Sequence, residues 1–292
     1  MAEILEKAPL TCSGCGLAIA TRIICRNFRK PSILVLSTGC LEVTTTLYPY
    51  SYFNCPVLHV AFENAAAVAS GVFRALKTQG REKEVDVIVL AGDGATFDIG
   101  FQALSGMVER GEEVCYICLD NEAYMNTGIQ RSGATPLFAS TTTTPTGRMS
   151  MGKLERKKKI SLILGMHPIA YLATASIAYH RDLIKKLEKA LAKKPSFLHI
   201  LTPCPTGWRF DPQHTVTLSK LAVETNYFPL FEIEDNKLKL NYKFEKRNPI
   251  SDFLKLQGRF SHLKEEEIQK IQEMVDEDYI QLVQLEEAGE VF

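Results

Sequence analysis

Short apolar runs and amphipathic stretches alternate along the first two thirds of the chain. Residues 85–91 form a run rich in valine and isoleucine, which is typical of a buried parallel strand, and a second apolar run covers residues 114–119. The residues between them, 98–109, follow a helical pattern that Arg110-Gly111 closes. This order predicts one β-α-β unit.

The same alternation continues on both sides of that unit. Further strands are predicted at 32–36, 169–174 and 196–201, and helices at 17–27, 65–77, 161–166 and 181–193. Strands separated by helices predict an α/β fold with a doubly wound, mostly parallel sheet. After residue 209 the pattern weakens to a β-hairpin over 227–244 and a polar helix over 264–277. We expect a main domain over residues 1–210 and a C-terminal extension over 211–292, which packs on the body or on a partner subunit.

Polar residues stand where two neighbouring strands end. The first strand runs into Gly92-Asp93-Gly94, and the second runs into Asn121. Ligands of open α/β sheets bind at this carboxyl edge. The glycines permit close approach of a ligand to the backbone, while Asp93 and Asn121 offer two oxygen ligands for a magnesium ion that bridges a diphosphate. The plain alternative is that the glycines only make a turn and that Asn121 only caps it.

Four cysteines occupy loops or strand ends. Cys12 and Cys15 form a CxxC motif flanked by glycines, Cys40 follows a predicted strand, and Cys204 lies between two prolines. The CxxC loop alone suits zinc, an iron–sulfur cluster or a redox disulfide. As a set of four thiolates, these cysteines fit zinc and a [4Fe–4S] cluster equally well, and each single cysteine also fits a buried core position.

The other four cysteines are predicted to be core residues. Cys115 and Cys118 form a second CxxC, but they lie within a strand, where side chains alternate between faces, so they cannot easily share a metal. Cys25 lies in a predicted helix, and Cys55 has no favourable placement at a strand end.

The stretch from GDG to the Asn-bearing strand end resembles the thiamine diphosphate motif. Its continuation, DNEAYMNTGIQRSGATP, is similar to the β subunits of the 2-oxoacid:ferredoxin oxidoreductase family, and the resemblance covers most of residues 11–209. It implies a thiamine diphosphate-binding fold, with Mg²⁺ held by Asp93, Asn121 and the backbone carbonyl of Ala123. It also implies that Asn126 is a catalytic residue that points toward the substrate. The remaining cofactor-binding residues would be Gly39, Gly92, Gly94, Ala95 and Thr127.

The same resemblance implies that Cys12, Cys15, Cys40 and Cys204 hold a [4Fe–4S] cluster, so that residues 1–210 would bind both cofactors. Redox chemistry favours iron–sulfur over zinc, since zinc cannot accept the electrons that oxidation releases. Two rival classes remain open: a non-redox thiamine enzyme with a zinc site, and a subunit that merely holds a cluster. One departure from the family pattern is Leu17, where other members often carry a polar residue.

The activity implied is the oxidative decarboxylation of a 2-oxoacid with coenzyme A and ferredoxin. Pyruvate is the expected substrate, while oxalate, 2-oxoisovalerate and 2-oxoglutarate remain open. The family's glutamate that activates the thiamine aminopyrimidine lies on an α subunit, so we expect that subunit to complete the site. Further γ and ferredoxin-like δ subunits are expected, because this chain carries cysteines for only one cluster.

Composition narrows the class of protein. Lysine and arginine together number 34, and so do aspartate and glutamate. The chain therefore has no net positive charge that would favour binding to nucleic acid. No run reaches the roughly 18 apolar residues of a membrane span, and the start lacks the apolar stretch of a signal peptide. Eight cysteines without such a signal favour a reducing, cytoplasmic location.

Two local features leave alternatives. Residues 139–159 lack periodicity and end in the basic cluster Arg156–Lys159, which reads as an exposed loop. The cluster could instead meet an anionic partner, such as the phosphates of coenzyme A or an acidic ferredoxin. Glu63 and Asn64 are predicted to cap the helix 65–77 rather than to reach the cofactor.

Overall fold

The fold is known from a computed structural model, which describes residues 5, 7–244 and 246–291. Eight strands form one sheet in the order β10-β9-β7-β8-β4-β3-β1-β2. The strands are β1 Ser32–Ser37, β2 Val57–Val60, β3 Asp86–Gly92, β4 Val114–Asp120, β7 Tyr171–Ser176, β8 Ser196–Leu201, β9 Phe231–Glu234 and β10 Lys237–Leu240. All neighbours pair in parallel except β9, which is antiparallel to both β7 and β10. The predicted mostly parallel sheet is confirmed.

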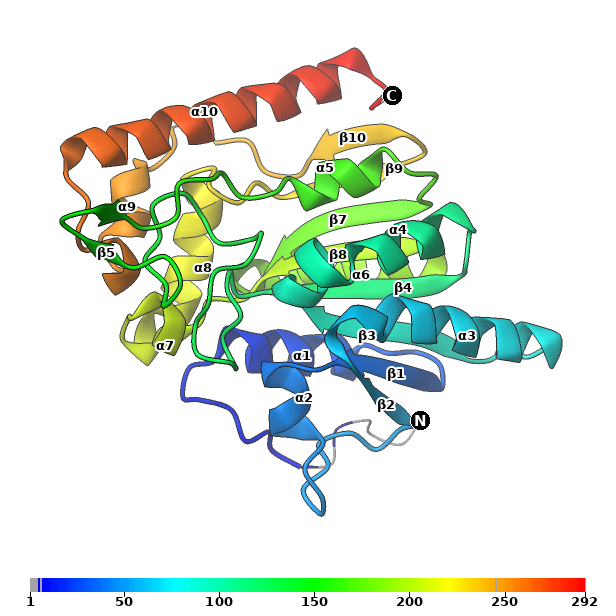
Figure 1. The fold of residues 1–292 in the computed structure, drawn as a ribbon. Coiled ribbons are helices and arrows are strands. Elements are labelled where there is room, and N and C mark those ends of the chain that lie inside the picture. The colour runs from blue at the N-terminus through cyan, green and yellow to red at the C-terminus, as the bar shows by residue number, and fades with distance from the viewer. Residues whose placement is uncertain (1–4, 6, 245, 292) are drawn as a thin grey trace.

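Helices cover both faces of this sheet (Figure 1). They are α1 Gly16–Arg26, α2 Cys40–Thr45, α3 Ala65–Thr78, α4 Phe101–Glu109, α5 Ile160–Gly165, α6 His180–Ala192, α7 Pro205–Trp208, α8 Thr215–Glu224, α9 Ile250–Leu254 and α10 Glu265–Ala288. One apolar cluster joins the sheet to α3, α4, α5 and the end of α10, and a second joins the opposite face to α1 and α6. The chain is therefore doubly wound, as its alternating pattern predicted.

Strand β4 shows why two cysteines are core residues. Cys118 packs in the cluster on one face of the sheet, whereas Cys115 packs in the cluster on the other face, and both side chains are fully buried. Period-two alternation sends residues three apart to opposite faces. Cys25 is buried in the cluster that contains Cys115, and Cys55 packs against that cluster.

The C-terminal region continues the sheet. A two-residue turn at Asp235-Asn236, with φ of 50° and 62°, joins β9 to β10, which is the expected hairpin geometry. The helix predicted at 264–277 begins one residue later and extends eleven residues further, to Ala288, where it buries Leu282. A third apolar cluster lies under α8, α9 and α10. The domain boundary at residue 210 stays a prediction.

Three local predictions were wrong. Helical structure after β3 begins at Gly94 rather than at residue 98, as a π-helical turn over Gly94–Ile99 that precedes α4. The side chain of Asn64 makes no capping hydrogen bond to α3, and Glu63 is an exposed residue of the 3₁₀ turn Phe62–Asn64. Residues 139–159 are not a simple exposed loop, because they include the short ribbon of β5 Thr146–Gly147 and β6 Ser150–Met151 as well as buried Ala139.

The long connections gather at one end of the sheet. Figure 1 shows the segment after β4, in green, beside α7, α8 and α9 at the carboxyl ends of the parallel strands. Trp208 at the end of α7 is fully buried there, in the third apolar cluster. This packing brings residues from distant parts of the sequence to the edge where β3 and β4 end.

Candidate functional site

Two adjacent strand ends form the first cavity. In the parallel pair of β3 and β4, Gly92 lies opposite Leu119, so Asp93 and Asn121 emerge side by side. A cavity of about 30 Å³, which we call the diphosphate cavity, lies at this edge. Its lining includes nearly all predicted cofactor and magnesium residues, namely Gly39, Gly92, Asp93, Gly94, Asn121, Ala123, Asn126 and Thr127. Ala95 is buried in the turn behind the cavity and does not line it.

Three oxygen-bearing groups converge in the diphosphate cavity. One terminal atom of the Asn121 amide lies 2.8 Å from the carbonyl oxygen of Ala123 and 3.0 Å from Oδ1 of Asp93. A nitrogen at this position donates a hydrogen bond to each oxygen. An oxygen at this position leaves three acceptors facing one another, which a cation would stabilise. Neighbouring ligands of an octahedral magnesium ion, with Mg–O of about 2.0–2.1 Å, lie about 2.9 Å apart, so the spacing fits this metal.

Asp93 is a buried carboxylate that no cationic side chain of the described residues pairs with. Its side chain is buried, and its Oδ2 accepts a 2.5 Å hydrogen bond from Ser132 Oγ. Burial and the nearby charge of Asp120 raise the pKa of the Asp93 carboxyl. In the part of the chain that the structure describes, no lysine, arginine or histidine forms an ion pair with Asp93. A buried carboxylate without a cation is costly, so a metal ion would find a strong ligand here.

Glycines open the backbone around Asp93. A side chain at Gly92 would point into open space, so a ligand can approach the main chain there. A side chain at Gly94 would instead overlap the ring of Tyr124. Tyr124 donates a 3.0 Å hydrogen bond to Asp98 Oδ2 and so closes one wall of the cavity. The π-helical turn that begins at Gly94 is a geometry often found at functional sites.

The four predicted cluster ligands lie around a second cavity, of about 240 Å³, which we call the cysteine cavity. Its lining includes Cys12, Cys15, Cys40 and Cys204, and also Leu17. The two cavities share Cys40, Asn121, Met125 and Asn126, so they are neighbours at the same edge. All eight cysteines of the chain are free thiols. The structure therefore brings together four thiols that are separated by up to 192 positions.

Tight backbone contacts bring the cysteine loops together. The amide of Gly16 donates a 3.1 Å hydrogen bond to the carbonyl of Pro203, and a Cβ at Gly16 would lie 2.7 Å from that oxygen. Gly14 has a φ of 68°, and its carbonyl accepts a 2.6 Å hydrogen bond from Thr215 Oγ1. The CxxC loop can therefore lie against the loop of Cys204 because Gly16 has no side chain, while Gly14 lets the same loop pack against Pro212.

Three of these thiols stand at helix starts. Cys15 precedes α1, Cys40 is the first residue of α2, and Cys204 precedes α7 and accepts a 3.3 Å hydrogen bond from the amide of Gly207. Burial, together with the neighbouring thiols of Cys204, Cys15 and Cys12, raises the pKa of Cys40 to about 12. Burial also raises the pKa of Cys15 and Cys204. These thiols hold their protons at neutral pH unless a metal displaces them.

The spacing of the thiols bears on the kind of metal. Within residues 5, 7–244 and 246–291, no three histidine, cysteine, aspartate or glutamate side chains are grouped closely enough to hold one metal ion. A zinc ion would require four thiolates at about 2.3 Å from a single centre. In a [4Fe–4S] cluster each cysteine binds a different iron, so the sulfurs stay further apart. Four thiols around one open cavity supply the number of cysteine ligands that either kind of site takes.

A buried charge network lies behind Asn121, and sequence reasoning missed it. Lys157 Nζ donates to Asp120 Oδ2 at 2.5 Å and to Glu122 Oε1 at 2.8 Å, while His199 lies 2.8 Å from the same Asp120 oxygen. Burial alone would raise the pKa of Asp120, but Lys157 and His199 outweigh it and lower the pKa to about 2. The run Asp120-Asn121-Glu122 was the available signal, since two acids flank the predicted ligand.

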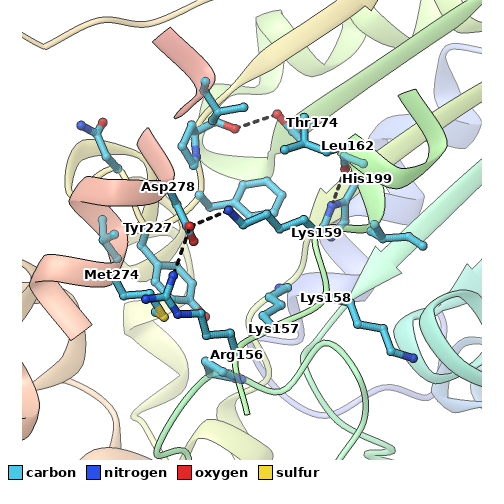
Figure 2. Close-up of a pocket in the computed structure, with 18 of the residues that line it drawn as sticks. Arg156, Lys157, Lys158, Lys159, Leu162, Thr174, His199, Tyr227, Met274 and Asp278 are labelled. Carbon is cyan, nitrogen blue, oxygen red and sulfur yellow. Dashed lines mark hydrogen bonds and ion pairs between the residues drawn. The ribbon is translucent and has the colours of Figure 1, made fainter. Parts of the chain in front are cut away.

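The basic cluster Arg156–Lys159 is neutralised within the chain. Figure 2 shows Arg156 and Lys159 reaching Asp278 of α10, and Lys158 extending the other way. Lys158 pairs with Asp98 at 2.7 Å, and Lys157 belongs to the buried network. These intrachain ion pairs weaken the hypothesis that the cluster serves coenzyme A phosphates or an acidic ferredoxin.

Comparisons with known proteins identify the family of this chain. The family described as "Thiamine pyrophosphate enzyme, C-terminal TPP binding domain" matches residues 37–200. The pyruvate synthase subunit PorB of Methanothermobacter thermautotrophicus is 51% identical over 275 residues, which cover 94% of this chain and 95% of that protein. This chain is a β subunit of the 2-oxoacid:ferredoxin oxidoreductase family. The resemblance drawn from GDG and Asn121 is thereby confirmed.

One further relative and one solved structure add to this comparison. The ketoisovalerate oxidoreductase subunit VorB of Pyrococcus furiosus is 46% identical over 283 residues, which cover 94% of this chain and 91% of that protein. A solved 2-oxoglutarate:ferredoxin oxidoreductase from Magnetococcus marinus has the same fold, with a TM-score of 0.58 and 21% identity over 74% of this chain and 79% of that chain. The β subunit therefore has the thiamine diphosphate-binding fold and works within a multi-subunit oxidoreductase.

None of the helices in the described part of the β subunit combines the length and the apolar character that crossing a membrane requires. Even α10, with 24 residues, carries three glutamates in its first turn alone.

Proposed function

We propose that this β subunit binds thiamine diphosphate through Mg²⁺ held by Asp93, Asn121 and the carbonyl of Ala123. The convergence of these three groups carries the proposal, since the Asn121 amide lies 2.8 Å and 3.0 Å from the other two oxygens and neighbouring ligands of Mg²⁺ lie about 2.9 Å apart. Gly39, Gly92, Gly94 and Thr127 line the same cavity and would approach the diphosphate. Ala95 would support this wall from the turn behind it.

We further propose that Cys12, Cys15, Cys40 and Cys204 hold a [4Fe–4S] cluster in the cysteine cavity. Its common wall with the diphosphate cavity, at Asn121 and Asn126, supports a direct passage of electrons between the two groups. When bound, thiamine diphosphate supplies the site for decarboxylation of a 2-oxoacid, and the cluster supplies one-electron redox chemistry. Zinc could not supply that redox chemistry.

The residues of the β subunit then divide the work. Asp93, Asn121 and Ala123 fix the metal and so the position of the cofactor, while Asn126, exposed at the junction of both cavities, is placed to orient the substrate. The diphosphate cavity is lined by a single carboxylic acid, Asp93, among the residues that the structure describes. A proton acceptor for the aminopyrimidine would therefore come from a partner α subunit.

Pyruvate is the proposed substrate, with coenzyme A as acyl acceptor and ferredoxin as electron acceptor. The match to pyruvate synthase subunits, at up to 51% identity, favours pyruvate over 2-oxoisovalerate, whose VorB relatives reach 46%. Partner γ and ferredoxin-like δ subunits would carry electrons onward from the one cluster. Eight free thiols fit a reducing, cytoplasmic setting.

Anaerobic purification of the complete complex tests this assignment. The β subunit should contribute about four iron and four sulfide per chain, and single Ala variants of the four cavity cysteines should lose the broad visible absorbance. Cys115→Ala and Cys118→Ala serve as controls and should keep it, because these side chains point into the core. Zinc in place of iron would overturn the redox assignment.

Substrate choice is tested on the same complex. Viologen reduction with coenzyme A should be fastest with pyruvate when pyruvate, 2-oxoisovalerate and 2-oxoglutarate are compared by kcat/KM. A higher kcat/KM for 2-oxoisovalerate would support the second candidate, a ketoisovalerate oxidoreductase.

A further inference from the structure

Glu122 is the central residue of the turn that follows β4. Its neighbours Asn121 and Ala123 both line the diphosphate cavity, whereas Glu122 itself does not. Glu122 is fully buried and has a φ of 68°, a backbone conformation that is uncommon for a residue with a side chain. Whatever holds Glu122 in this conformation also sets the directions of its two neighbours.

Three donors hold the Glu122 carboxylate. Lys157 Nζ and the Tyr227 hydroxyl donate to Oε1 at 2.8 Å and 2.6 Å, and Arg259 Nη2 donates to Oε2 at 2.6 Å. Figure 2 labels Lys157 and Tyr227, the two residues that donate to the same Glu122 oxygen. Two of the three donors, Tyr227 and Arg259, belong to the region after residue 210.

Arg259 also reaches Asn121 by a second route. Its guanidinium stacks over the ring of Trp208, with 3.9 Å between the guanidinium carbon and the ring centroid. The Trp208 indole donates a 2.8 Å hydrogen bond to the backbone carbonyl of Asn121. The guanidinium is itself buried, and its orientation is fixed because its Nε donates a 2.9 Å hydrogen bond to Gln257 Oε1. Arg259 therefore supports two successive residues of the turn.

The backbone of Glu122 is tied to Asp93 from the opposite side. Its carbonyl accepts a 2.7 Å hydrogen bond from Thr135 Oγ1, which in turn accepts a 2.9 Å hydrogen bond from the amide of Ser132. The hydroxyl of Ser132 donates to Asp93. A continuous chain of hydrogen bonds thus links Glu122 to the carboxylate at the centre of the diphosphate cavity.

Three carboxylates are buried at this edge, those of Asp93, Asp120 and Glu122, and they differ in whether a cation of the chain pairs with them. Asp120 pairs with Lys157, and Glu122 pairs with Arg259 at 2.6 Å. Asp93 is left as the carboxylate without a cation among the described residues. Pairing the two neighbours inside the fold therefore reserves Asp93 for a metal ion.

We propose that Tyr227 and Arg259 are positioning residues for the magnesium site, which they set by holding Glu122 and, through Trp208, Asn121. This gives the C-terminal region a role in cofactor binding although neither side chain lines the diphosphate cavity. The inference rests on the proposed magnesium and thiamine diphosphate site.

Calorimetry on the metal-stripped complex, with Mg²⁺ titrated in the presence of thiamine diphosphate, tests this role. Tyr227→Phe should raise the Mg²⁺ concentration for half-saturation by about tenfold, the scale of effect that residues behind metal ligands show. Tyr171→Phe is the matched control, because its hydroxyl makes the same 2.6 Å bond to a glutamate, Glu232, at the far end of β7. That control should match the wild type.

Arg259 supplies a graded second test. Arg259→Met should shift the Mg²⁺ midpoint further than Tyr227→Phe, because it removes both the Glu122 pair and the stack on Trp208. Arg259→Lys keeps the positive charge and should recover part of the shift. Thermal unfolding of the same metal-free samples separates a positioning effect from a general loss of stability.

Each result decides between distinct conclusions. A shifted Mg²⁺ midpoint in Tyr227→Phe, with Tyr171→Phe unchanged and similar unfolding temperatures, supports the proposal. Midpoints equal to the wild type in all variants, or equal shifts in both tyrosine variants, overturn it while leaving the proposed function intact. A wild-type complex that binds thiamine diphosphate without any Mg²⁺ dependence overturns the proposed metal site itself.

Discussion

The two cavities share a wall but are built in different ways. In the diphosphate cavity, one terminal atom of the Asn121 amide already lies 2.8 Å from the carbonyl oxygen of Ala123 and 3.0 Å from Oδ1 of Asp93. In the cysteine cavity, no three thiols are grouped around one point in the described chain, and burial keeps Cys40 protonated. The first cavity is organised before a ligand arrives, because hydrogen bonds and ion pairs fix it. Under the proposed function, the second is completed only when the cluster binds, because the thiols must first lose protons.

The origin of the residues explains the difference. Asp93 and Asn121 follow adjacent strands of the sheet. The pairing of Gly92 with Leu119 sets where the two strands end relative to each other. Cys12 and Cys204 come from loops near opposite ends of the chain, which meet through the Gly16 contact with Pro203. The sheet brings residues at adjacent strand ends close together, whereas two loops need close backbone contact to be held together.

Removing the carboxylate should produce the largest effect. We expect Asp93→Ala in the complex to weaken Mg²⁺-dependent thiamine diphosphate binding by more than about 100-fold, since even residues behind a metal ligand cost about 10–100-fold. Iron content should stay unchanged if the cavities are independent. Calorimetry and iron analysis on the same sample measure both.

Asp86→Ala is the matched control for that variant. Asp86 is a buried carboxylate on the same strand, but it lies at the other end of β3 and pairs with Lys194 at 2.6 Å. A similar loss of cofactor in both variants would point to damage of the strand and contradict a metal role for Asp93.

Local sequence was enough for the strand-end residues. The valine-rich run before GDG and the run before Asn121 each predict a buried strand, and adjacent parallel strands place their ends together. The register that joins them needs no information from elsewhere in the chain. This is why Asp93 and Asn121 could be predicted to lie together before the structure was known.

The support behind those residues could not be predicted in the same way. Tyr227 and Arg259 lie 105 and 137 positions from Glu122, in a region with weak periodicity. Lys157 looked like part of a solvated basic run, yet its neighbours in sequence point in other directions and it alone enters the buried network. Such bonds depend on how loops fold over the sheet edge, which no local pattern encodes.

A smaller change should break only the cysteine side. Gly16→Ala places a Cβ about 2.7 Å from the carbonyl oxygen of Pro203, so the two cysteine loops must move apart. Overpacking of this kind costs roughly 1–3 kcal/mol. We expect most of the iron to be lost while Mg²⁺-dependent thiamine diphosphate affinity stays within about twofold of the wild type.

Gly71→Ala provides the comparison for that variant. Gly71 lies within α3, and a Cβ there would meet no atom within 4 Å, so iron content should not change. Equal iron content in Gly16→Ala and Gly71→Ala would show that the contact with Pro203 does not hold the cysteine loops. Parallel loss of iron and cofactor in Gly16→Ala would show that the two cavities are not independent.

The smallest expected effect is a pH dependence confined to the cysteine side. Folding raises the pKa of Cys40 from 9.0 to about 12, chiefly by burial and then by the neighbouring thiols. Between these values the folded metal-free chain keeps a proton that the unfolded chain has lost, so this contribution to stability falls as pH rises above about 9. Urea unfolding of the reduced, metal-free chain should show that decline, and Cys40→Ala should make it shallower.

Cys55, whose pKa burial raises to about 11, contributes equally to both proteins and cancels in the comparison. The iron-loaded protein should lack the Cys40 contribution, because its thiol is already ionised by the metal. Equal slopes in the metal-free wild type and Cys40→Ala would mean that the thiol at the shared wall is not held protonated, and the contrast between the two cavities would then have to rest on geometry alone.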